Sequence, residues 1–120
     1  MKRNFIALCA LLLAACGQRA ARPIGDFTLP VYTPRYASGF EITGAAGSRS
    51  TLVTVHNPWY GDEVTDQYLF IARDGETAPE GFGGQVLEGD AGRIVCMSST
   101  HIAMLDAIGE AGRVVGVSGI

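Results

Sequence analysis

The side chains best suited to metal or covalent chemistry are few and widely spaced in this sequence. His56 and His101 stand far apart and no cysteine pairs accompany them, so we predict no metal site. Asp62, Glu63 and Asp66 form an acidic stretch without the pattern of a calcium loop, and we expect a solvated turn there. No spacing joins a nucleophile, a base and an orienting group. We therefore expect neither an enzyme nor a cofactor.

Cys16 is the residue whose surroundings define its chemistry most clearly. Lys2 and Arg3 are followed by an apolar run over residues 5–15, which is too short for the roughly twenty residues that span a bilayer. The run ends Leu-Ala-Ala directly before Cys16 and resembles the lipobox of bacterial lipoproteins, in which the cysteine thiol takes a diacylglycerol. We predict a signal peptide over residues 1–15 and a lipid anchor at Cys16, although an ordinary signal peptide could also contain a cysteine.

Net charge limits the class of binding partner, and cysteine content limits the possible disulfides. Loss of Lys2 and Arg3 with the signal takes the formal net charge from −3 to −5, and no lysine remains. This balance argues against a nucleic-acid partner, which requires clustered basic residues. Cys96 is the one cysteine outside the signal and the lipid site, so we expect no internal disulfide in this sequence. Its apolar neighbours predict a small buried side chain.

The elements that must position any site fall into two parts. Residues 16–39 contain a polar tether and an extended stretch. Residues 40–92 are β-rich, because apolar and polar residues alternate between glycine and proline turns. Residues 81–84 are glycine-rich but lack the lysine and the following helix of a phosphate loop. The strands that we predict in this part span residues 40–43, 51–56, 67–72 and 85–87.

Residues 93–120 have a different pattern. A consecutive apolar run predicts a buried strand over residues 93–98, and apolar residues at helical spacing predict a helix over 102–110. Ser99 or Thr100 could cap this helix, and a second buried strand should cover residues 113–117. Strand, helix and strand form a βαβ unit whose sheet edges stay bare. We therefore expect the sequence to be the N-terminal fragment of a longer protein.

The string from Arg93 to Gly119 resembles the opening of periplasmic substrate-binding proteins of ABC transporters for iron complexes and cobalamin. The shared features are a serine-rich loop after the first strand, Asp106 and Gly109 in the helix region, and a strand reading Val-Val-Gly-Val-Ser over residues 114–118. Residues 55–59 and 68–72 look like the N-terminal extension of one branch of this family. The resemblance covers roughly residues 40–120.

The resemblance implies an α/β fold with an N-terminal β-rich extension and then the first βαβ unit of a truncated, two-lobed class III binding protein. It implies a lipid-anchored, periplasm-facing binding component of an importer. The ligand would be a metal chelate, namely a ferric siderophore, haem or cobalamin, and the protein partner an ABC permease. Two alternatives are an envelope enzyme with catalytic residues beyond residue 120 and a small structural lipoprotein.

The expected ligand contacts lie beyond the carboxyl ends of the two parallel strands, where open α/β sheets bind ligands. After the first strand these residues are Ser98, Ser99, Thr100 and His101, and after the second Ser118. Free amides at the helix start suit an anionic or carbonyl-bearing chelate. The alternatives are that the hydroxyl residues only cap the helix and that His101 is a structural group.

Overall fold

The computed structural model of the protein describes residues 21–59 and 65–118. The predicted signal peptide and the lipid site at Cys16 therefore lie outside the described residues. The chain divides into two compact units, Met1–Glu88 and Gly89–Ile120. Each unit is described by itself below.

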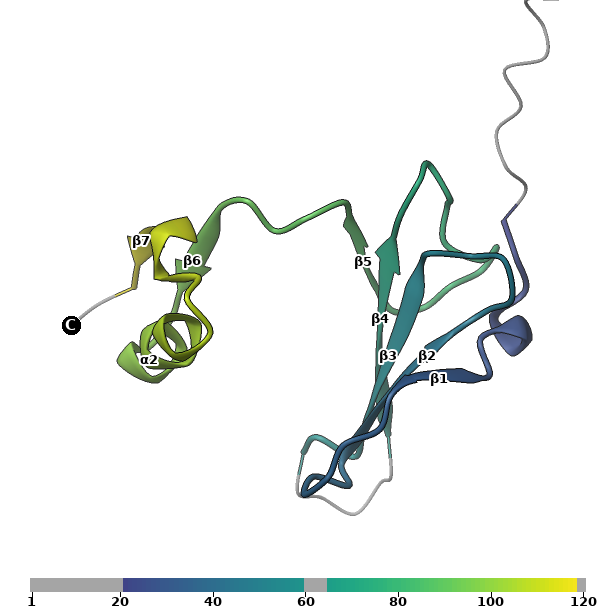
Figure 1. Cartoon of the computed structure of the whole chain (residues 1–120), viewed down its shortest axis with the longest axis horizontal. Helices are drawn as coiled ribbons and strands as arrows, with labels where there is room; N and C mark the ends of the chain where they lie inside the picture. The colour runs from purple at the N-terminus through teal and green to yellow at the C-terminus, as the bar shows by residue number, and fades with distance from the viewer. Residues whose placement is uncertain (1–20, 60–64, 119–120) are drawn as a thin grey trace, which may run out of the picture. The chain divides into compact units, whose positions relative to one another are not determined.

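The first unit is a twisted five-stranded sheet with strand order β1-β2-β3-β4-β5 (Figure 1). Strands β1 to β4 pair antiparallel with their neighbours, whereas β5 runs parallel to β4. Four of the strands follow the sequence prediction closely, and β1 forms within the stretch that the sequence assigns to a tether and an extended segment. The strands are β1 Leu29–Tyr32, β2 Phe40–Gly44, β3 Thr51–His56, β4 Asp66–Ala72 and β5 Gln85–Glu88.

Alternation in β3 sets the two faces of the sheet. Leu52 and Thr54 are buried, whereas Val53 is only half-buried and Val55 is exposed. Successive side chains on a strand point to opposite faces, so Leu52 and Thr54 share one face of the sheet and Val53 and Val55 share the other. The strand β4 ends at a turn in which Asp74 and Gly75 both adopt positive φ, at 54° and 73°. Asp and Gly tolerate this left-handed backbone, which is disfavoured for most side chains.

The core of the first unit lies on one face of the sheet and is built around Phe70. This ring is 1% exposed and meets Phe27 edge-on, with centroids 5.4 Å apart. A short 3-10 helix, η1 Ile24–Asp26, brings Phe27 over the sheet. Phe82 packs against the same cluster from the loop before β5. Edge-to-face contacts of this kind add to the gain from burying aromatic area.

The opposite face of the sheet, called here the outer sheet face, is apolar and partly exposed. Cross-strand partners place Ile42 beside Val53, and Val53 beside Leu69. In the described part of this unit, the extensive contacts between elements are those between neighbouring strands. The outer sheet face consists of Phe40, Ile42, Val53, Val55, Leu69, Ile71 and Leu87.

The second unit is a βαβ unit, as the sequence predicts. The parallel strands β6 Ile94–Cys96 and β7 Val114–Val117 are joined by helix α2 Ser99–Ala107 and the 3-10 turn η2 Ala111–Arg113. Cys96 is 1% exposed, in line with the expected buried side chain. The sequence also predicts that the residues on either side of Cys96 are buried, and this is wrong. Val95 and Met97 are exposed because only one face of this two-stranded sheet meets the helix.

Helix α2 begins three residues earlier than predicted. Ser98 is its N-cap, with extended backbone at φ −156° and ψ 158°, and its hydroxyl accepts a bond from the His101 amide at 3.4 Å. Apolar spacing alone could not locate this start, because the first turn carries polar residues. Gly109 follows the helix at φ 76°, the left-handed conformation in which glycine often ends a helix.

The fold class is therefore mixed α/β, with a mostly β first unit and a single described α-helix in the second. A two-lobed class III binding-protein fold is not shown. Its second lobe and joining helix have no counterpart among residues 21–59 and 65–118. None of the helices formed by these residues has the length and apolar character needed to cross a membrane.

Candidate functional site

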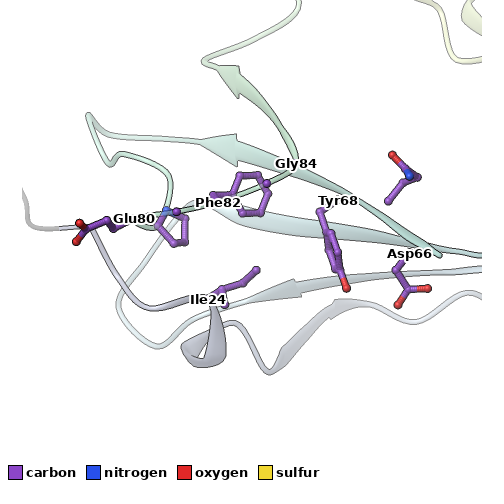
Figure 2. Close-up of a pocket in the computed structure, with 10 residues that line it drawn as sticks. Ile24, Asp66, Tyr68, Glu80, Phe82 and Gly84 are labelled. Carbon is purple, nitrogen blue, oxygen red and sulfur yellow. The ribbon is translucent and has the colours of Figure 1, made fainter.

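A cavity of about 410 Å³ opens on the core side of the five-stranded sheet. It lies between the start of β4 and the loop that leads into β5, with Ile24 of η1 at its rim (Figure 2). We call it the aromatic pocket. Its volume falls in the range of small-molecule sites. The described residues that line it are Ile24, Asp66, Gln67, Tyr68, Pro79, Glu80, Gly81, Phe82, Gly83 and Gly84.

The wall of the aromatic pocket is fixed by the core behind it. The Phe82 ring meets the Phe70 ring edge-on, with centroids 6.0 Å apart. Gly84 lies so close to Tyr68 that a Cβ added at Gly84 would meet the Tyr68 carbonyl oxygen and would come within 2.7 Å of the Tyr68 Cβ. Only glycine fits there without a shift of the wall. The pocket is thus formed by the folded chain before any ligand enters.

The charged groups of the pocket are two carboxylates. Asp66 opens β4, and its Oδ1 lies 3.3 Å from Nδ1 of His56. The other ring nitrogen of His56, Nε2, lies 3.0 Å from Oε1 of Glu41. These contacts tie β2, β3 and β4 together at one end of the sheet. Glu80 is exposed at the other side of the pocket.

Sequence reasoning did not find this pocket. It assigned Asp66 to a solvated acidic turn, whereas the structure places this residue half-buried in β4 and paired with His56. The other two residues of that predicted turn, Asp62 and Glu63, lie outside the described residues. It also treated residues 81–84 only as a failed phosphate loop. The available signal was Phe82 between glycines, since an aromatic residue in such a loop often packs back onto the core.

The five predicted ligand contacts lie in the second unit and are exposed. Cys96 pairs with Val117, and the Ser118 amide donates to the Cys96 carbonyl at 2.9 Å, so Ser98 and Ser118 follow adjacent strand ends. Their backbone placement agrees with the predicted edge of the sheet. Ser98 caps the helix, a role that the sequence analysis gave to Ser99 or Thr100. Ligand binding by Ser98, Ser99, Thr100, His101 and Ser118 stays a prediction.

Within the described stretches, no group of three or more His, Cys, Asp or Glu side chains is arranged to hold a metal ion. Cys96 is a free, buried thiol.

The known proteins to which this chain is similar are not the substrate-binding proteins that the sequence motifs indicated. The chain is 29% identical over 91 residues to the flagellar L-ring protein of Shewanella sp. strain MR-4 and, equally, to that of strain MR-7. The matched stretch is 74% of this chain and 41% of each relative. The chain thus spans less than half the length of these curated relatives. No family model and no solved structure matches it.

These relatives overturn the importer interpretation. The resemblance to ABC binding proteins, the metal-chelate ligand and the ABC permease as partner were wrong, because the matched proteins are named as parts of a flagellar ring. The features that suggested the importer family were a strand, a serine-rich loop, a helix region with Asp106 and Gly109, and a strand ending Val-Ser. Such a βαβ unit is common to many folds and has no specific function of its own.

Proposed function

We propose that this chain is a non-catalytic structural lipoprotein of the bacterial cell envelope and that it contributes to a ring-shaped flagellar assembly. The observation that carries the proposal is the similarity to two flagellar L-ring proteins over 74% of the chain. This function corresponds to the structural lipoprotein that the sequence analysis held as an alternative. The predicted lipid at Cys16 would attach the protein to a membrane, and the chain between Cys16 and η1 would separate the sheet from it.

The outer sheet face supports an assembly role. Its residues form apolar rows across β2, β3 and β4, such as Ile42, Val53 and Leu69. Burying such a surface against another protein releases water and stabilises the complex, at roughly 25 cal/mol per Å² of apolar area. Because a ring is built from repeated subunits, we propose a second copy of this chain as the occupant of this face.

The proposal is tested by isolating flagella, with their envelope-embedded bases, from the bacterium that encodes the chain. An epitope-tagged chain should copurify with these bases and should be lost from them when the flagellar genes are deleted. The control is a tagged envelope lipoprotein unrelated to motility, which should be absent from the preparation. Absence of the tagged chain from flagellar bases, together with normal motility after its gene is deleted, would contradict the proposal.

A further inference from the structure

We propose that the aromatic pocket binds an elongated organic cation, with a positive group at each end and an apolar middle. The inference goes beyond the structural role above and does not depend on it. It rests on the order of side chains along the pocket. In Figure 2, Asp66 and Glu80 lie at opposite ends of the labelled row, with Tyr68 and Phe82 between them.

The two ends of the pocket are negative and available. The Asp66 side chain is 32% exposed, and its Oδ1 faces His56. Its Oδ2 makes no hydrogen bond or ion pair with residues 21–59 and 65–118. Glu80 is exposed and takes part in no ion pair within the same ranges. None of the described lining residues is a lysine or an arginine. The pocket therefore favours cations and repels anions of the same shape.

The middle of the pocket suits an apolar body. Tyr68 and Phe82 offer aromatic rings, and Ile24 and Pro79 add aliphatic surface. Aromatic faces also attract a cation that lies over them, and burial strengthens this attraction. Because the packing of Phe82 on Phe70 fixes the wall in advance, little ordering is needed when a ligand enters.

Two sources could supply this chemistry, a free diamine or a protein segment in which basic residues flank an apolar one. The test titrates the full-length chain in detergent, by calorimetry, with p-xylylenediamine and with a capped Lys-Phe-Lys peptide. Terephthalate, which has the same aromatic middle and negative ends, is the matched anion. At least one of the two cations should bind, and terephthalate should not. If the diamine binds more tightly, the ligand is a free diamine; if the peptide binds more tightly, the ligand is a protein segment.

Variants of the pocket then locate the binding. Glu80→Gln should lower the affinity for the cation about fivefold, as expected for the loss of one partly exposed charge pair. Glu88→Gln makes the same change on β5 outside the pocket and should leave the affinity unchanged. The proposal is overturned if neither cation binds, if terephthalate binds equally well, or if Glu80→Gln and Glu88→Gln have the same effect.

Discussion

Gly84 is a position where adding a single methyl group should destabilise the first unit. A methyl group at Gly84 would come within 2.7 Å of the Phe82 ring and would also meet the Tyr68 carbonyl. We predict that Gly84→Ala lowers the free energy of unfolding by about 1–3 kcal/mol, as overpacking does elsewhere. Urea unfolding followed by circular dichroism measures this change.

Gly83→Ala is the matched control for this prediction. A Cβ at Gly83 meets nothing within 4 Å, so the variant should keep its stability to within about 0.5 kcal/mol. Equal effects of the two substitutions would show that the close approach of Gly84 to Tyr68 does not exist in solution.

Cys16 has a chemical role that can be tested directly. If its thiol accepts the lipid, Cys16→Ser should abolish incorporation of labelled palmitate and should leave the protein with an uncleaved signal. Cys96→Ser serves as the control, because Cys96 is buried in the second unit and should not affect labelling. Labelling that persists in Cys16→Ser would refute the lipid site.

At the scale of single elements, helix α2 depends on its N-cap. The Ser98 hydroxyl accepts from the His101 amide at 3.4 Å, which is a long bond. We therefore expect Ser98→Ala to destabilise the helix by about 0.5–1 kcal/mol, at the lower end of the range for N-cap losses. Amide hydrogen exchange across α2 should become faster by about two- to fivefold.

Ser99→Ala is the control, since Ser99 is the first residue within the helix and not its cap. Its effect on hydrogen exchange should be small. If Ser99→Ala accelerates exchange more than Ser98→Ala does, the cap is Ser99, as the sequence analysis allowed.

At the scale of the whole molecule, the outer sheet face is the feature that links the fold to an assembly. Val55 is 36% exposed near the end of β3 on this face. An aspartate at this position would bring an unpaired charge into the proposed contact, which carries a large desolvation cost. We predict that Val55→Asp weakens self-association of the detergent-solubilised chain at least tenfold, as measured by sedimentation velocity.

The control for this prediction is Val86→Asp. Val86 is 46% exposed and pairs with Phe70, so it belongs to the opposite face of the same sheet. Its substitution adds the same charge but should leave self-association unchanged. Loss of association in both variants, or in neither, would remove the outer sheet face as the contact between copies.

Local sequence determined most of the elements. The alternation over residues 51–56 predicts β3 because side chains on a strand point to opposite faces in turn, and this depends on no distant residue. The βαβ order of residues 94–117 follows from the same local patterns. Local patterns misled the functional interpretation, however, since a capped helix between two apolar strands occurs in proteins of many functions.

Tertiary structure alone decided the site. Asp66 and Glu80 are separated along the chain by a strand and a loop, and they line one pocket only because the loop before β5 returns over Tyr68 and packs Phe82 on Phe70. Likewise, β5 lies parallel to β4, so the strand pairing could not be inferred from a short hairpin turn. Sequence determines what each segment prefers locally, but which distant side chains meet depends on how the packed core brings the segments together.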